Sequence, residues 1–322
     1  MNHKLETLKR SDVPKELLKS PSIRHLFSFL FFDWIIIILS SIMMFRTPAY
    51  LYPFWILIIG GRLHGLGVIL HDLTHVPYRK NKSWKLRLLE IFAGYPIAST
   101  VNAMGYHHLR HHRNTLFKTD PYFSYNKKCS DFDKFILTFK KGPLFVPFWI
   151  FGGFVGSVAY YIPNLRASYA RLFLQDISKS DLKNNAEVIE CCKEARYQSI
   201  FHLLLFGLAI KFNSIYYAYY MALPVAGILC IYRLLIEHEY DIVEDKKIYT
   251  ILECSFDHHT SLFGRMLIAP HHIGYHCMHH LHPSVGVHAL ESLSKWYLAN
   301  SRHYAEIYGD KEQIKLLGSV VK

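Results

Sequence analysis

The sequence predicts an all-α integral membrane protein, in which a four-helix transmembrane stem carries a cytosolic helical cap. The chain has 322 residues, of which 51 % are hydrophobic and 15 % aromatic. Several of its apolar stretches approach the roughly 20 residues that span a bilayer. Eight of its 21 histidines are concentrated in three short motifs outside these stretches. The formal net charge is +12, and a cluster of basic residues beside the first two motifs indicates a cytoplasmic face.

The N-terminal part predicts a cytosolic leader followed by a helical hairpin in the membrane. Residues 1–24 are polar and mixed in charge, and they lack the short apolar core and cleavage site of a signal peptide. Leu26–Phe45 is almost entirely apolar, and Tyr50–Leu70 is a second apolar segment after a short turn. A soluble hairpin can look similar, but runs of this length favour the membrane. Arg62, inside the second run, should face the bundle interior or reach the interface.

The segment after this hairpin is strongly basic. Lys and Arg outnumber the acids over residues 76–141, which marks a cytoplasmic face by the positive-inside rule. The first two histidine motifs therefore share that side. A nucleic-acid partner is not expected, because the sequence contains no helix-turn-helix, zinc-finger or RNA-binding signature.

A second hairpin is predicted from topology. The third histidine motif must meet the first two, so an even number of spans must lie between them. We assign 197–212 and 215–236 as the two spans. The stretch 143–163 is rich in Pro and Gly, and we expect an interfacial or re-entrant element there rather than a span.

The remaining polar segments, 164–196 and 239–322, should complete the cytosolic cap. The six cysteines show no regular spacing, so neither a disulfide framework nor a zinc ribbon is expected. The predicted organisation has three parts: a leader (1–24), a membrane domain (25–298) and a C-terminal cytosolic tail (299–322).

The three histidine motifs have the spacing of metal ligands on helices. Residues three and four apart share a helix face, so each motif should present its imidazoles together. Neutral imidazoles suit zinc, copper, iron and nickel. Solvated or core histidines are the alternative, but three such motifs on hydrophobic flanks disfavour it. Eight ligands are too many for one ion, which predicts two metal ions. The eight are His71, His75, His108, His111, His112, His276, His279 and His280.

These motifs resemble the three histidine boxes of the membrane fatty acid desaturase superfamily, which includes sphingolipid desaturases and carotenoid ketolases and hydroxylases. The first box is His71-Asp72-x-x-His75. The second is His108-x-x-His111-His112 leading to Asp120-Pro121. The third is Gly274-Tyr275-His276-x-x-His279-His280-x-x-Pro283. The resemblance extends from the first apolar hairpin to about Leu298, and it does not specify the substrate.

The resemblance implies a di-iron centre in the cytosolic cap, with O2 as co-substrate and a lipid or fatty acyl substrate. A further histidine after the last span completes the ligand set in that family, and His238 matches its position. We therefore expect a desaturase that abstracts hydrogen from unactivated C–H bonds. A hydroxylase or ketolase that acts on a fatty acyl chain, a carotenoid or an alkane is the alternative. A non-catalytic membrane protein that binds metal or haem is a third hypothesis.

Other residues near the boxes receive weaker assignments. Asp72, Glu237 and Asp257 are candidates to hydrogen-bond the ligand imidazoles, although solvated helix-end charges would look the same. His107 breaks the helical register of the second box and is interpreted as a neighbour rather than a ligand. His64 lies on the same helix face as His71 and could support that ring. The other histidines are assigned to the cap: His258, His259, His271, His272, His282 and His288.

An external electron donor is also expected. The chain carries no haem, flavin or iron–sulfur motif, and its cysteines are too scattered to hold a cluster. A ferredoxin or a cytochrome b5-like protein would therefore supply electrons. The basic residues beside the first two boxes would bind such a donor or anionic lipid headgroups, and both interpretations stay open. They are Arg79, Lys80, Lys82, Lys85, Arg87, Lys127 and Lys128.

Overall fold

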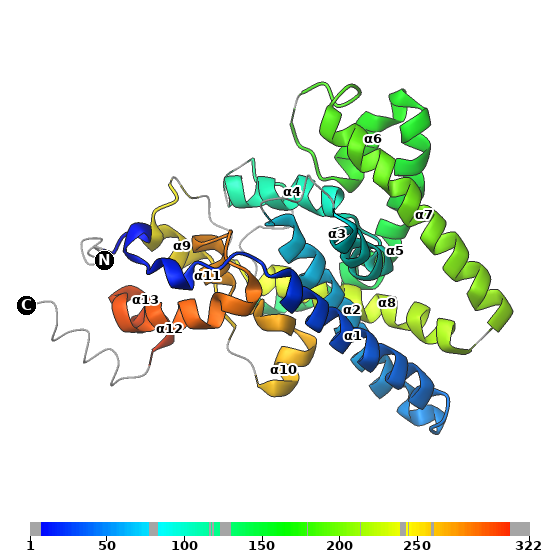
Figure 1. The fold of residues 1–322 in the computed structure, drawn as a ribbon, viewed down its shortest axis with the longest axis horizontal. Coiled ribbons are helices and arrows are strands. Elements are labelled where there is room, and N and C mark those ends of the chain that lie inside the picture. The colour runs from blue at the N-terminus through cyan, green and yellow to red at the C-terminus, as the bar shows by residue number, and fades with distance from the viewer. Residues whose placement is uncertain are drawn as a thin grey trace, which may run out of the picture.

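The structure is a computed structural model, shown in Figure 1. It describes residues 8–76, 83–115, 117, 119–122, 130–178, 180–212, 214–238, 243, 245–258 and 261–309. Within these ranges the backbone forms helices and no β-strand, apart from one isolated bridge between His238 and Ser255. The all-α prediction is therefore confirmed for this part of the chain.

The first hairpin consists of α1 (Ile23–Met44) and α2 (Tyr52–Thr74), joined by the 3₁₀ turn η3 (Ala49–Leu51). Both helices are long and apolar enough to cross a membrane. Phe31 and Leu39 of α1 are 64 % and 57 % exposed. Large apolar side chains exposed along one helix are those of a surface that faces lipid rather than water.

A buried ion pair lies inside this hairpin. Arg62 Nη1 donates a hydrogen bond to Asp33 Oδ1 at 2.9 Å, and Asp33 Oδ2 lies 2.7 Å from His271 Nε2. Gly65 makes room for the carboxylate, because a Cβ at this position would lie 2.6 Å from Asp33 Oδ2. The prediction that Arg62 faces the bundle interior is confirmed, and its partner is a single acid within the apolar run of α1.

Three long helices follow the second box: α5 (Asp131–Tyr161), α7 (Ala186–Phe212) and α8 (Ser214–Ile236). Glycines of α5 bring it close to both of the others. A Cβ on Gly142 would lie 2.5 Å from the Cα of Ile228 in α8, and one on Gly153 would lie 2.5 Å from Gln198 Nε2 in α7. α5 therefore packs against both helices at the level of these glycines.

Four helices of the described chain are long and apolar enough to cross a membrane: Ile23–Met44, Ala49–Thr74, Asp131–Tyr161 and Tyr216–Ile236. This number matches the predicted four-helix stem, but by length and composition the candidate is α5 where we expected α7. Residues 143–161 belong to one continuous helix, α5, despite Pro143 and Pro147, so the stretch shows no break. That it lies at the interface rather than spans the membrane stays a prediction. Prolines are tolerated in membrane helices because neighbouring helices and local adjustments satisfy the freed backbone groups.

The second box lies on a helix that is held between the two hairpins. α4 (Val101–Asn114) starts at Thr100, whose hydroxyl accepts from the backbone N–H of Ala103. Short elements precede and follow it: α3 (Trp84–Leu89), η4 (Glu90–Gly94), η5 (Tyr95–Ile97), η7 (Pro163–Leu165) and α6 (Arg166–Phe173). Tyr219 of α8 donates its hydroxyl to the carbonyl of Pro96 at 2.6 Å, which ties α8 to the start of this region.

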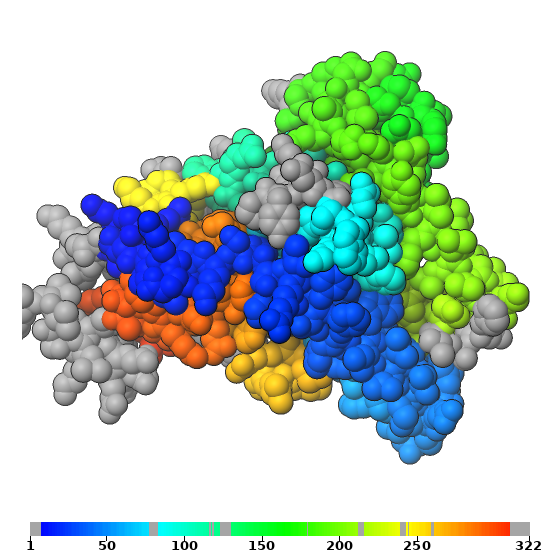
Figure 2. Space-filling model, in the orientation of Figure 1, coloured from blue at the N-terminus to red at the C-terminus, as the bar shows by residue number. Residues whose placement is uncertain are grey.

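The third box lies in a separate group of short helices. They are α9 (Ile248–Cys254), α10 (Leu262–Leu267), η8 (Pro270–His272), α11 (His276–Leu281), η9 (Val287–Ala289), α12 (Leu290–Asn300) and α13 (Arg302–Tyr308). The described part of the leader runs across this group, as the blue segment over orange shows in Figure 2. Val13 is buried in the same apolar cluster, and the backbone N–H of Gly286 donates to the carbonyl of Lys19 at 2.8 Å.

Candidate metal centre

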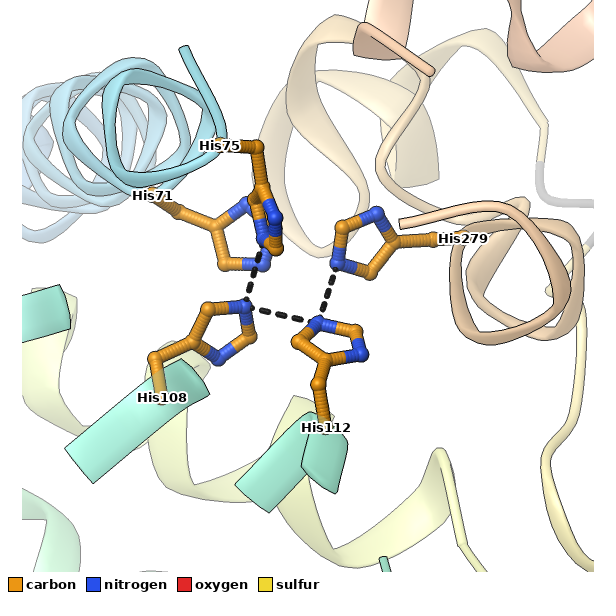
Figure 3. A group of neighbouring side chains, drawn as sticks. All are labelled: His71, His75, His108, His112 and His279. Atoms are coloured by element: carbon orange, nitrogen blue, oxygen red, sulfur yellow. Dashed lines mark hydrogen bonds between the residues drawn. The ribbon is translucent and has the colours of Figure 1, made fainter. Parts of the chain in front are cut away.

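The histidine boxes come from three elements that meet at one place. The first box lies at the C-terminal end of α2, the second on α4 and the third on α11. In Figure 3, imidazoles from all three elements point toward one another. The first group of imidazoles has five members, and each offers a nitrogen within 4.8 Å of the others: His71, His75, His108, His112 and His279.

The ring nitrogens of this group lie at the spacing of ligands that share an ion. His108 Nε2 is 3.0 Å from His75 Nε2 and 2.9 Å from His112 Nε2. His112 Nε2 is also 2.8 Å from His279 Nε2. Two nitrogens that bind one ion at about 2.1 Å and at a right angle would be about 3.0 Å apart. The measured distances fit that arrangement.

Hydrogen bonds alone satisfy this group poorly. Each neutral imidazole carries one N–H proton. His112 Nε2 would have to share its proton between His108 and His279, or accept from both, and the Nδ1 atoms of His112 and His279 have no partner within the described chain. A cation that accepts one lone pair from each ring removes this conflict. The donor set therefore fits a bound metal ion better than a network of imidazole hydrogen bonds.

A second group lies directly beside the first. It consists of His111, His238 and His280, which again lie within 4.8 Å of one another through one nitrogen each. His276 falls outside the group by this measure, but its Nε2 lies 3.0 Å from His238 Nε2. His112 of the first group is close to His280 of the second, with ring centroids 4.5 Å apart. The nine histidines expected as ligands thus lie together, with eight of them in two adjacent groups.

Histidines of both groups are held in the neutral form that metal binding requires. Burial, followed by the neighbouring imidazoles, lowers the pKa of His108 and of His112 well below the ordinary histidine value. Burial likewise lowers the pKa of His238 to about 3, with His111 as the next cause. A neutral imidazole has a free lone pair for a cation, whereas a protonated one repels it. These rings are therefore poised to bind a metal at neutral pH.

One acid orients a clustered imidazole. Both oxygens of Asp120 approach His111 Nδ1, at 2.9 and 3.0 Å, which leaves Nε2 of that ring for a metal. Such a carboxylate fixes the tautomer and direction of a ligand ring. Glu237, one of the expected acids, only lies close to a ring: its Oε2 is 3.5 Å from His276 Nδ1, and the two atoms form no hydrogen bond in the described chain. Asp120 stands in the motif of the second box, and its place shortly after that box is the signal that could identify it.

The other two expected acids serve the backbone instead. Asp72 Oδ1 accepts from the backbone N–H of Val287 at 3.2 Å. Asp257 accepts from the backbone N–H of Cys277 at 2.6 Å and from the hydroxyl of Tyr304. Each carboxylate therefore anchors the backbone around the third box and does not hold an imidazole. Their assignment as partners of ligand imidazoles is wrong, because backbone N–H groups at the start of α11 and in the loop after it are the nearer donors.

Four other described histidines have hydrogen-bond partners outside the two groups. His107 Nδ1 lies 2.7 Å from the hydroxyl of Tyr122, and His64 Nδ1 lies 2.9 Å from the carbonyl of Leu267. His271 pairs with Asp33, and His282 Nε2 lies 2.8 Å from the hydroxyl of Tyr297. None of them belongs to either group of clustered nitrogens in the described chain. The assignment of His259 lies outside the described residues.

A mostly apolar cavity lies beside both histidine groups. Its volume is about 110 Å³, and it runs between α2, α4, α5 and α8. Imidazoles of both groups form part of the lining. The apolar lining includes Leu63, Ile97, Met104, Phe145 and Trp149. A hydrocarbon chain in this cavity would therefore lie next to the metal centre.

Comparison with known proteins gives one match. Residues 47–311 match the protein family described as fatty acid desaturase. These residues begin just after α1 and include α2 and all three boxes. No curated protein and no solved structure matches the chain.

Proposed function

Because the chain belongs to the fatty acid desaturase family, which makes it an oxidoreductase, we propose that it is an O2-dependent desaturase of membrane lipids with a di-iron centre. The observation that carries this proposal is the meeting of three distant boxes and His238 in two adjacent groups of imidazoles. The ligands would be His71, His75, His108, His111, His112, His238, His276, His279 and His280. Iron bound there would supply the O2 activation that breaking an unactivated C–H bond requires.

The chain's own residues position the reactants. Asp120 would hold the ring of His111 in direction through its hydrogen bond to Nδ1. The apolar wall of the cavity excludes water and would take an alkyl chain alongside both groups. A lipid substrate therefore has a place next to the centre, and the proposed reaction needs no further acid or base from the cavity wall.

The contacts of α4 favour α7 over α5 as a spanning helix. Arg110 on α4 donates to Glu187, at the start of α7, at 2.8 Å, and the hydroxyl of Tyr106 donates to Asp176. The polar segment between α5 and α7 therefore lies on the side of the second box. Tyr122, shortly before α5, also contacts that box. If both ends of α5 lie on one side, the crossing pair before the third box is α7 and α8.

An external carrier would supply the electrons, for which we propose an acidic ferredoxin or a cytochrome b5-like protein. Most of the basic residues expected at the docking surface lie outside the described residues: Arg79, Lys80, Lys82, Lys127 and Lys128. Lys85 and Arg87 are described, and both are exposed on α3. These two residues form a basic surface on α3, which an acidic carrier would approach.

Metal analysis and product analysis together test the proposal. The purified protein should contain two irons per chain, and His112→Ala should lower this number and abolish turnover. His202→Ala is the matched control, because His202 is an equally buried histidine, 3 % exposed, that is outside both groups. If His202→Ala keeps its full iron content and activity, the effect of His112→Ala comes from the loss of a ligand rather than from the loss of a buried ring.

The product decides between the candidate reactions. A host that expresses the chain should accumulate lipid lighter by two hydrogens, whereas a hydroxylase or ketolase would add oxygen. Metal without O2 consumption would instead indicate a non-catalytic metal protein. An active protein without iron would contradict the proposal.

A further inference from the structure

The cavity beside the metal centre is not lined as a plain hydrocarbon tunnel. Several polar atoms on its wall are buried and have no partner within the described chain: His64 Nε2, Ser99 Oγ, His107 Nε2 and Arg233 Nη1. Their residues are between 5 and 8 % exposed. An alkyl chain offers no hydrogen bond to any of them. A buried polar group left without a partner destabilises the filled cavity.

His107 is the best placed of these groups to hold a ligand. Its Nδ1 is engaged by the hydroxyl of Tyr122 at 2.7 Å, and its ring lies against Trp149, with centroids 5.5 Å apart. Both contacts fix the ring, so Nε2 keeps one direction. A phenol is a better donor than a neutral imidazole, so the Tyr122 hydroxyl donates to Nδ1 and His107 Nε2 carries the proton. The cavity therefore presents a fixed N–H donor next to His108 and His111.

The cation of the cavity wall has an acid beside it. Arg233 Nε lies 3.1 Å from Glu237 Oε1, so the guanidinium needs no carboxylate from a ligand. His107 Nε2 is a neutral N–H donor in a mostly apolar wall. Such a donor suits a hydroxyl or carbonyl oxygen.

We infer that the substrate of this desaturase-family site is a lipid oxygenated on its hydrocarbon part, apart from any ester or amide linkage, and that this hydroxyl or carbonyl oxygen accepts a hydrogen bond from His107 Nε2. This inference rests on the proposed function, and it narrows the substrate class. His107, which the sequence indicated as a mere neighbour of the second box, thereby selects the substrate. Tyr122 acts through His107 as a positioning residue.

Equilibrium binding and turnover of matched lipid pairs test the inference. The probes are stearoyl phosphatidylcholine against a series of hydroxystearoyl isomers, and β-carotene against its ring-hydroxylated and ring-ketone derivatives. The iron-loaded protein in neutral detergent should bind one oxygenated member about 5- to 100-fold more tightly than its plain counterpart, which is the range for one buried hydrogen bond. The position of the oxygen in the isomer that binds most tightly then gives the spacing between that oxygen and the reacting carbon.

Variants assign the preference to His107. His107→Phe keeps a ring in the cavity but lacks the donor, and it should abolish the preference. His107→Gln, whose amide offers an N–H, should restore part of it. Tyr122→Phe should weaken it through loss of the ring's fixed direction. His202→Phe replaces a buried histidine that does not line this cavity and should leave the preference unchanged.

Each result has a distinct meaning. Equal binding of both members of every pair, binding of neither, or a preference that survives His107→Phe overturns the inference. Equal turnover of plain and oxygenated lipids overturns it while the proposed function stands. A binding preference that depends on His107, without any turnover, supports the oxygen site and contradicts the proposed reaction.

Discussion

Replacement of Asp120 by Asn tests how the second metal group is held. Asp120 is 1 % exposed, and both of its oxygens face His111 Nδ1, at 2.9 and 3.0 Å. Oδ1 also accepts from the backbone N–H of Tyr122 at 2.8 Å. Asn keeps the size of the side chain and one acceptor oxygen, so the bond to Tyr122 can persist. The variant removes the negative charge that strengthens the bond to the ring.

The expected effect is a selective loss of metal affinity. A charge-assisted hydrogen bond is about twice as strong as a neutral one. Removal of such a partner from a ligand ring typically costs 10- to 100-fold in metal affinity, or about 1.4–2.8 kcal/mol. His111 belongs to one histidine group only. A graded chelator series with metal counting should therefore show one ion lost from Asp120→Asn at a concentration that leaves the unchanged protein fully loaded.

Asp72→Asn is the matched control. Asp72 is fully buried and adjoins His71, but it accepts from the backbone of Val287 rather than from an imidazole. Asn keeps an acceptor oxygen for Val287, so this replacement should leave both metals bound. Equal metal loss in the two variants, or full retention of both ions in Asp120→Asn, would refute the role of Asp120 in holding His111.

Three further predictions concern the stem, the topology and the donor. Asp33→Ala should destabilise the protein by about 3–5 kcal/mol in denaturant unfolding, because it leaves the buried cation of Arg62 unpaired, and Arg62→Leu added to it should recover most of the loss. A reporter at Asn185 should lie on the cytosolic side, and an external position would mean that α5 is a true span. Lys85→Glu combined with Arg87→Glu should raise the apparent Michaelis constant for an acidic donor at unchanged maximal rate, most strongly at low salt. An unchanged donor dependence would assign these residues to the lipid surface.

Local pattern was sufficient to identify the histidines that cluster, and it was insufficient for the side chains that support them. The spacing of His108, His111 and His112 determines which rings share a helix face, so these residues could be named from the sequence as candidate ligands. Asp33 could not, because one acid in an apolar run has no visible partner until Arg62 and His271 pack against it. In each case the partner depends on contacts between segments far apart in the chain.

The membrane helices show the same limit. Length and apolarity select α5 and not α7, whose first half carries charged residues such as Glu187, the partner of Arg110 on α4. If α7 is the crossing helix, as proposed, these two properties do not identify the crossing helices by themselves. The expectation of an interfacial segment at 143–163 used Pro and Gly content, which predicted a break that the packed helix does not show.

The path of the leader has a consequence for how the protein matures in the cell. The leader is synthesised well before its partners: Arg10 donates to the carbonyl of Lys246, 236 residues later, and Val13 packs among residues of the third-box region. His279 completes the first histidine group from the same late region. The leader must therefore remain without its partner while the segments between them are synthesised and inserted. Metal can enter a complete site only after synthesis has passed the third box, so a chain that stalls earlier would have its stem in the bilayer but no finished centre.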